Sequence, residues 1–375
     1  MPEPRREVVS ALRRGPTWFL ARGEPGLGRL METLSLARIV AAGQPRGRVR
    51  LLTSAAAVPL ARGLCQFPVD EFDLERGGDL QQTLIDSRAV QGLLERLART
   101  GPAALVVDGY AFLLPLLREA TSAALVAVAN RHDLDNPAHS RGARLLQVAL
   151  HTPADLVLVG ELRRSWRLAR LGGLPVLLLP ALVRPEASAA VRQRPSEAGV
   201  VAVLGGGSRG DRDLEASTEA ILAALEQAVA RREISSCRVF TGPGAGRAQA
   251  RHPHLEMGLD PASGLDSMRA ARVVVARAGR STLAEILALG KRAVVVAARS
   301  DTLRGAEQAA NASLAAALSP AVVVLEMARI GEIGSACRQA DALSPRPWRP
   351  GNSRVWPALA AADRRTVTVS PRHAE

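Results

Sequence analysis

The chain has 375 residues, of which 47% are hydrophobic and 23% charged, so it is globular, with material for one large or two ordinary domains. The formal net charge of +13, from 49 basic and 36 acidic side chains, favours anionic ligands such as nucleotide phosphates or acidic lipids. Aromatic residues make up only 3%, which is poor material for stacking on bases, so nucleic acid is not an expected partner.

The first half of the chain alternates short apolar runs with helical patterns. Strands are predicted at residues 17–21, 49–53, 104–108, 125–129, 156–159 and 176–179. Helical patterns lie between them, for example at residues 30–42 and 82–99. This order predicts a parallel sheet covered by helices on both faces, in a first domain spanning residues 1–183.

A second alternation follows a segment rich in Pro, Arg, Ser and Glu, residues 184–199, which is predicted to be a linker. The second domain is expected to span residues 200–345 and the tail residues 346–375. Predicted strands lie at residues 200–204, 238–241, 272–276, 293–297 and 321–325, and predicted helices at 213–231, 282–289 and, in the tail, 355–365. Two α/β halves joined by a linker predict two Rossmann-like domains facing across a cleft, with ligands at the carboxyl ends of the strands.

Cellular location is indicated by what the chain lacks. The three cysteines are isolated and show no CxxC spacing, which is typical of reduced thiols in a cytoplasmic protein. Residues 1–14 have no apolar core of a signal peptide, and no run of about 20 apolar residues is present to span a membrane. We therefore expect a cytoplasmic protein.

A glycine-rich turn, LGGGSRGD at residues 204–211, directly follows the first strand of the second half. Glycines let the backbone approach a ligand closely, and the next helix offers its amino-terminal N–H groups to an anion. The residues expected at a phosphate are Gly206, Gly207, Ser208 and Arg209. The alternative is a tight turn capped by a side chain. No Gly-Lys-Ser/Thr follows, so the turn is not a Walker loop.

A second motif, RAGRSTLAE, begins at Arg277, where another strand leads into a helix. Gly279 allows close approach of the backbone, and Ser281 or Thr282 is expected to cap the helix. Glu285 lies about one turn into that helix, where its carboxylate can accept two hydroxyls of a ribose. Alternatively, Glu285 interacts with the helix dipole or pairs with a nearby arginine.

A third motif, EQAANA at residues 307–312, contains two amides on one helix face, Gln308 and Asn311. Each amide offers a donor and an acceptor, which suits the hydroxyls of a sugar. The alternative is a solvated polar face.

Together the three motifs resemble, in order and spacing, the UDP-N-acetylglucosamine transferase of peptidoglycan synthesis and its GT-B superfamily, the MurG-like, family 28 type of glycosyltransferase. GGSRG is similar to that family's GGSQG phosphate turn, RAGRSTLAE to its R-x-G-x-x-T-x-x-E element, and QAANA to its Q-x-x-N-A run, with Gly290 closing a turn. The resemblance implies that Glu285 binds the ribose, Ser208 and nearby amides the diphosphate, and Gln308 and Asn311 the hexose. It covers residues 200–320 well and the first half weakly.

A weaker resemblance lies in residues 23–38, GEPGLGRLMETLSLAR, which are similar to the G-x-G-H-x-x-R loop of GT-B transferases and related hydrolases and epimerases. Gly26 and Gly28 fit this loop, which would contact the acceptor or the diphosphate. Arg29 stands where many members have histidine, and Glu32 where many have arginine. Arginine cannot act as a base at neutral pH, although it can bind phosphate bidentately. Either the base lies elsewhere or the chemistry differs.

Another base is suggested by NRHDLDNP, residues 130–137, a predicted loop at the end of a strand. His132 is a candidate base because the imidazole side chain can exchange a proton, and the neighbouring carboxylates, Asp133 and Asp135, could orient it. Alternatively, the aspartates bond their own backbone and His132 faces water. Asp108, in a D-G-Y segment similar to one in the hydrolase branch, either shapes the same pocket or caps its strand.

No cofactor and no metal are expected, because the histidines form no metal-binding pattern. Enzymes of this type stabilise the leaving diphosphate with amides, helix termini and cations, here Arg209, Arg277 and Arg280. The resemblance thus implies a hexosyltransferase that uses a nucleotide sugar, by resemblance a UDP-sugar. Alternatives are a sugar-nucleotide hydrolase or epimerase and a non-catalytic nucleotide-sugar-binding protein.

The acceptor is not specified by the sequence and is either a small secondary metabolite or a lipid-linked glycan. A lipid-linked acceptor would require peripheral contact with the inner face of the membrane. Arginines close to apolar residues in the amino-terminal arm, residues 5–18, suit such contact, and a solvated basic arm is the alternative.

Overall fold

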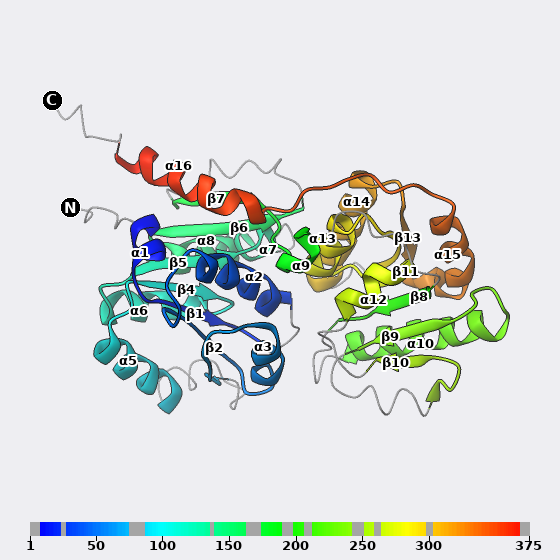
Figure 1. Cartoon of the computed structure of the whole chain (residues 1–375), viewed down its shortest axis with the longest axis horizontal. Helices are drawn as coiled ribbons and strands as arrows, with labels where there is room; N and C mark the ends of the chain where they lie inside the picture. The colour runs from blue at the N-terminus through cyan, green and yellow to red at the C-terminus, as the bar shows by residue number, and fades with distance from the viewer. Residues whose placement is uncertain are drawn as a thin grey trace. The chain divides into compact units, whose positions relative to one another are not determined.

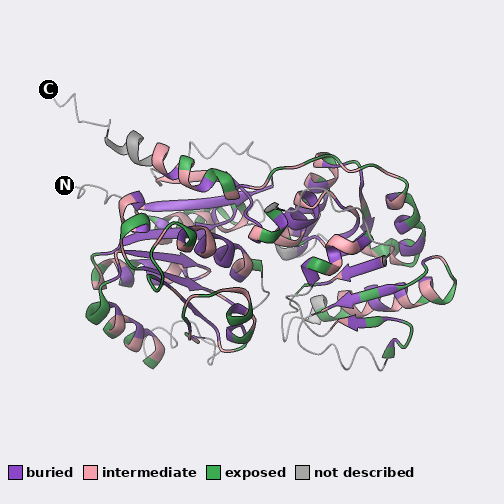
Figure 2. Cartoon of the chain, in the orientation of Figure 1, coloured by how far each residue is buried: buried purple, intermediate pink, exposed green. Residues whose placement is uncertain are grey.

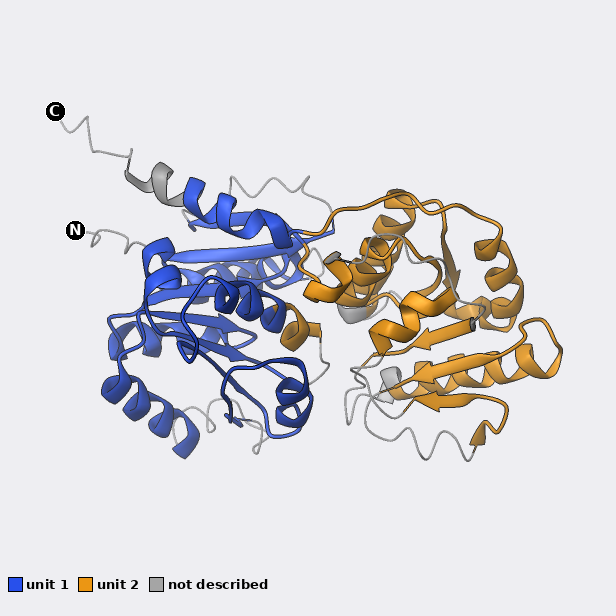
Figure 3. Cartoon of the chain, in the orientation of Figure 1, with its two compact units in different colours: residues 1–23, 33–180, 351–375 blue, residues 24–32, 181–350 orange. Residues whose placement is uncertain are grey.

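A computed structural model of the chain describes residues 8–23, 28–74, 87–135, 139–162, 174–189, 198–205, 212–241, 251–258, 264–297 and 303–367 (Figure 1). The strands of its sheets are largely buried (Figure 2). Two compact units divide the chain (Figure 3). Unit 1 comprises residues 1–23, 33–180 and 351–375, and unit 2 comprises residues 24–32 and 181–350.

Unit 1 is built on a seven-stranded parallel sheet with the strand order β3-β2-β1-β4-β5-β6-β7. Its strands are β1 Thr17–Ala21, β2 Val49–Thr53, β3 Val69–Glu71, β4 Ala104–Asp108, β5 Ala124–Ala129, β6 Leu156–Glu161 and β7 Val176–Pro180. Its helices are α1 Val8–Arg14, α2 Gly28–Ala42, α3 Val58–Leu64, α5 Arg88–Thr100, η1 Ala111–Leu113, α6 Leu114–Ala120, α7 Arg131–Asp135, α8 Arg141–His151, η3 Asn352–Arg354 and α16 Val355–Val367. The first turn of α2, residues 28–32, falls in unit 2.

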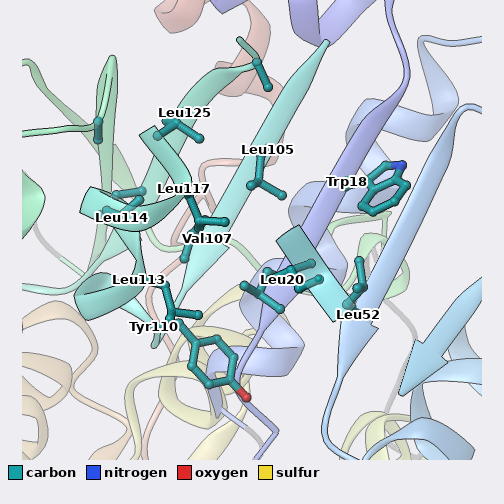
Figure 4. Packing of buried hydrophobic residues seen from close by; sticks show 14 of the residues in the cluster. Trp18, Leu20, Leu52, Leu105, Val107, Tyr110, Leu113, Leu114, Leu117 and Leu125 are labelled. Atoms are coloured by element: carbon teal, nitrogen blue, oxygen red, sulfur yellow. The ribbon is translucent and has the colours of Figure 1, made fainter. Parts of the chain in front are cut away.

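The core of unit 1 explains why its strands are continuous apolar runs. Strands β1, β4, β5 and β6 are buried along their whole length, as expected when helices cover both faces of a parallel sheet. Alternate residues of neighbouring strands share one face and form one buried cluster with residues of η1 and α6. Figure 4 shows Trp18, Leu20, Leu105, Val107, Leu113, Leu114, Leu117 and Leu125 of this cluster.

The last helix, α16, contacts α1 and β7 and therefore belongs to unit 1. The Arg13 guanidinium lies 5.0 Å from the ring centroid of Trp356, in a cation–π contact between α1 and α16. The predicted tail, residues 346–375, thus supplies a helix to the unit that is formed by the start of the chain.

Unit 2 is built on a six-stranded parallel sheet with the strand order β10-β9-β8-β11-β12-β13. Its strands are β8 Ala198–Val203, β9 Cys237–Phe240, β10 Glu256–Gly258, β11 Ala271–Arg277, β12 Arg292–Ala297 and β13 Val322–Glu326. Its helices are α9 Pro185–Ala189, α10 Arg212–Ala230, α12 Gly264–Ala270, α13 Arg280–Ala288, α14 Leu303–Leu318, η2 Met327–Glu332 and α15 Ile333–Asp341. The two parallel α/β units confirm the predicted fold class.

Some local predictions differ from the structure. Strands β3 and β10 were not predicted, because three residues are too few to give a recognisable pattern. The predicted loop at residues 130–137 contains helix α7. The segment 184–199, predicted as a linker, contains the short helix α9, which starts at Pro185, a residue favoured in the first turn of a helix.

Gly290, which the sequence motif placed after α13, terminates that helix. Gly290 has φ +60, its N–H donates to the Leu287 carbonyl at 3.1 Å, and the Lys291 N–H donates to the Ile286 carbonyl at 3.0 Å. This pair of bonds is the Schellman motif, which requires a left-handed residue after the helix.

We expect Gly290→Ala to lower the free energy of unfolding by about 1–2 kcal/mol, because a Cβ is disfavoured in the left-handed region. Gly92→Ala is the matched control: Gly92 lies inside α5, with open space where a Cβ would be, so alanine should stabilise by about 0.5–1 kcal/mol. Urea denaturation of both variants tests the pair, and equal effects would contradict the assignment.

Candidate donor-binding site

The predicted donor-binding motifs lie at one edge of the unit 2 sheet. Strand β11 pairs in parallel with β8, with Ala276 opposite Val203, so the segments that follow both strands leave the same edge. Gly205, which follows β8, has φ +77, a conformation that favours glycine. The rest of this glycine turn falls outside the described residues, and so do the predicted Gly206, Gly207, Ser208 and Arg209, as well as Gly26.

Arg277, the last residue of β11, lies beside the start of the glycine turn. Its Nη1 donates to the Thr218 hydroxyl of α10 at 3.3 Å, and its Nη2 lies 3.3 Å from the position that a Cβ on Gly205 would occupy. A permanent positive charge is thereby placed where the sequence predicts a phosphate.

Helix α13 begins at Arg280, two residues earlier than the predicted start at residue 282. Gly279 is the N-cap and provides no side-chain bond, so the expectation that Ser281 or Thr282 caps the helix is wrong. The reason is that Gly279 already has the extended conformation of an N-cap, with φ −71 and ψ 129. Ser281 instead donates from its hydroxyl to the Gly28 carbonyl at 3.0 Å.

Glu285 is buried in α13 and paired with a residue that the sequence did not single out. Arg184 donates from Nε to Oε1 of Glu285 at 2.6 Å and from Nη2 to Oε2 at 2.9 Å. Both residues are buried. The arginine partner weighed as an alternative is therefore present. An ionised carboxylate has about four acceptor positions, so capacity remains for further hydrogen bonds.

Gln308 and Asn311 lie on α14 and are only 8% and 5% exposed, so they do not form a solvated polar face. Asn311 donates from Nδ2 to the Ala278 carbonyl, at 3.3 Å, just before α13. Gln308 shares that helix face, and its buried Oε1 accepts no hydrogen bond from the residues that the structure describes. Its oxygen is available to a ligand hydroxyl.

The first turn of α2 contributes a second buried ion pair to unit 2. Arg280 donates from Nη2 to Oε2 of Glu32, and the two side chains are 9% and 4% exposed. Arg29, one turn before Glu32 on the same helix, is half-buried, whereas Gly28 is exposed. Of the cations expected at the diphosphate, Arg280 thus already has a carboxylate partner.

In unit 1, the predicted catalytic residues His132 and Asp133 lie on α7, which follows the end of β5. Asp133 and Asn130 cap α7 reciprocally: the Asn130 N–H donates to the Asp133 carboxylate at 2.9 Å and the Asp133 N–H to the Asn130 side-chain oxygen at 2.8 Å. Asp133 therefore bonds local backbone, as the alternative interpretation held. His132 is half-buried, and its buried Nδ1 has no hydrogen-bond partner in the described part of the chain.

Asp108 and Glu161 are two buried carboxylates of unit 1, at the ends of β4 and β6, the strands on either side of β5. Asp108 accepts a hydrogen bond from the Thr33 hydroxyl at 2.7 Å. Glu161, which was not predicted, accepts from the Arg131 N–H at 2.7 Å, directly before His132. In the sequence, Glu161 could have been noticed as an acidic residue at the end of an apolar strand. Arg184, the other residue that was not singled out, is harder to notice because it is one of several arginines in a polar segment.

The described residues contain no group of three or more His, Cys, Asp or Glu side chains placed to bind a metal ion. No helix among them has the length and hydropathy that crossing a bilayer requires.

Residues 200–332, which include all three donor motifs, match the family model of the glycosyltransferase family 28 C-terminal domain. No curated protein sequence matches the chain. The match confirms the resemblance inferred from the motifs.

Solved structures share the fold over nearly the whole chain. TcCGT1 in complex with UDP aligns with a TM-score of 0.58 at 12% identity, over 96% of each chain. UGT2 of Phytolacca americana, complexed with UDP-2fluoro-glucose and pterostilbene, gives 0.55 at 11% over 96% of each chain. The spinosyn forosaminyltransferase SpnP gives 0.54 at 16% over 95% of this chain and 96% of its own. Residues 200–332 are therefore similar to a glycosyltransferase family 28 C-terminal domain, and the whole chain shares the two-unit α/β fold of these glycosyltransferase structures.

Proposed function

We propose that the chain transfers a hexose from a UDP-sugar to a hydroxyl of a small-molecule acceptor, and that unit 2 binds the donor. The observation that carries this proposal is the set of buried polar side chains around the start of α13, namely Glu285, Gln308 and Asn311. A small number of polar side chains placed together in mostly apolar surroundings is typical of a ligand site. The choice of UDP is supported by the structures complexed with UDP and UDP-2fluoro-glucose that share this fold.

Each part of the donor has a proposed contact in unit 2. The Glu285 carboxylate accepts hydrogen bonds from the ribose hydroxyls, and Arg184 fixes the orientation of this carboxylate. The diphosphate lies against the glycine turn, the amino terminus of α13 and Arg277. Gln308 accepts a hydrogen bond from a hydroxyl of the hexose through its Oε1, which has no partner among the residues that the structure describes.

In the reaction, an acceptor oxygen forms a bond to the anomeric carbon while the bond from that carbon to the diphosphate oxygen breaks. The electron pair of the broken bond leaves with the nucleoside diphosphate, and the proton of the acceptor hydroxyl passes to a base. We assign the base to His132, whose Nδ1 has no hydrogen-bond partner in the described residues, because Arg29 cannot accept a proton and Asp133 caps α7.

The choice of a small-molecule acceptor is supported by two proteins of similar fold. Pterostilbene is a small molecule in one of these complexes, and another structure is named for spinosyn. Both support the secondary-metabolite class over the lipid-linked glycan, which would bring the chain to the inner face of the membrane.

The proposal is tested first by thermal denaturation of the protein with UDP, GDP, dTDP and ADP. A nucleotide at about 100 times its dissociation constant should add about 2.7 kcal/mol to the free energy of unfolding. We expect UDP to give the largest shift. A larger shift with another nucleotide would contradict the choice of UDP as the nucleotide of the donor. The absence of a shift with all four nucleotides would contradict the donor site.

Replacing Arg184 with methionine should lower the free energy of unfolding by about 3–5 kcal/mol, because it leaves the buried Glu285 carboxylate without a counter-charge. The double variant Arg184→Met/Glu285→Met should regain most of this stability without regaining UDP binding. Arg251→Met removes one partner of the exposed pair Arg251–Glu219, 3.0 Å apart, and should cost less than about 1 kcal/mol. UDP binding by the double variant at wild-type affinity would rule out the ribose contact.

We expect His132→Ala to reduce kcat by about 100-fold to 10,000-fold and to leave the dissociation constant of the UDP-sugar unchanged. The matched control is His139→Ala, a second half-buried histidine of unit 1 whose buried Nδ1 also has no partner among the described residues, but which precedes α8 and does not follow a strand end. Steady-state kinetics and calorimetry separate the two effects. Turnover by His132→Ala at the rate of the control would remove His132 from the mechanism.

A further inference from the structure

Two contacts join the first turn of α2 to the first turn of α13 within unit 2. One is the buried ion pair of Glu32 and Arg280. The other is the hydrogen bond from the Ser281 hydroxyl to the Gly28 carbonyl, 3.0 Å long. Residues 28–32 are thereby held at the amino terminus of α13, where the proposed function places the diphosphate.

The ion pair is unexpected on electrostatic grounds. A buried carboxylate close to a bound diphosphate repels it, and the Glu32 carboxylate also occupies Arg280, which would otherwise be a cation for the phosphates. A buried ion pair adds little net stability compared with apolar side chains of similar size. Its presence therefore calls for a role other than stability.

The position of Arg29 suggests such a role for the ion pair. Arg29 lies three residues before Glu32, so both side chains are on the same face of α2, the face that meets Arg280. It also follows Gly28 directly, and the Gly28 carbonyl is bonded to the first turn of α13. The guanidinium is always charged and can bind phosphate oxygens through two parallel hydrogen bonds.

We propose that Glu32 is a positioning residue: by binding Arg280 it fixes the first turn of α2 so that Arg29 provides the side-chain charge to the leaving diphosphate. This inference rests on the proposed function, because it assumes a diphosphate at the start of α13. When the bond to the anomeric carbon breaks, the diphosphate gains one negative charge, and Arg29 stabilises that charge without transferring a proton.

The experiment compares the binding of UDP with that of uridine, which lacks the diphosphate, and needs no acceptor. We expect Arg29→Gln to weaken UDP binding about tenfold or more and to leave uridine binding unchanged, because charged hydrogen bonds are lost. Glu32→Gln should weaken UDP binding in the same way, and Glu32→Asp should restore part of it. The double variant should bind UDP no more weakly than Arg29→Gln, because Glu32 acts through Arg29.

The sign of the Glu32→Gln effect separates this role from simple charge neutralisation. If Glu32 merely occupied Arg280, its removal would release that cation and tighten UDP binding, which would overturn the proposal. Additive losses of UDP affinity in the double variant would also overturn the proposal. Unchanged UDP affinity in Arg29→Gln would overturn it too, and this test remains usable if Glu32→Gln does not fold.

A matched control and the wild-type protein complete the design. Glu332→Gln breaks the exposed pair with Arg329, at 2.5 Å, and should leave UDP binding unchanged. A wild-type protein that binds neither UDP nor uridine contradicts the proposed function itself. A wild type that binds both equally overturns the role of Arg29 alone.

Discussion

Because β8, β11 and β12 pair in parallel, the segments that follow these strands all leave the same edge of the unit 2 sheet. Helices in such a fold begin at that edge, so their amino-terminal N–H groups point toward one place. The donor motifs are spread over more than 100 residues of sequence, and the parallel register alone brings Gly205, Arg277 and the start of α13 together. The position of the donor site is thus a consequence of strand order, and the side chains only select the ligand.

Arginines lie around this edge. Arg184 and Arg280 are paired with buried carboxylates, and Arg277 donates to the Thr218 hydroxyl. We propose that the amino terminus of α13, Arg277 and Arg29 supply the positive charge that a bound diphosphate meets. The two ion pairs then set geometry: one orients a carboxylate for hydroxyl groups, and the other fixes a helix turn.

The predictable part of this structure is the part specified by local pattern. Apolar runs gave β1, β2 and β4 to the residue, and the glycine at 290 marked the end of α13, because strands and helix ends are encoded by adjacent residues. The ion pairs of Glu285 and Glu32 were not predictable, since their partners are 101 and 248 residues away. Their arginines also look like any others in a chain so rich in arginine. The sequence suggested an arginine partner for Glu285 without identifying it.

The same reasoning assigns roles among the acidic residues at the strand ends of unit 1. Asp133 bonds the backbone at the start of α7, Asp108 accepts from Thr33, and Glu161 accepts from the Arg131 N–H. Each of these carboxylates is therefore tied to the scaffold, and moving a proton onto one of them would weaken a bond that the fold uses. His132 differs, because its Nδ1 contributes to none of these bonds in the described residues. We therefore propose that His132, on a helix whose start is fixed by these carboxylates, exchanges a proton with the acceptor hydroxyl.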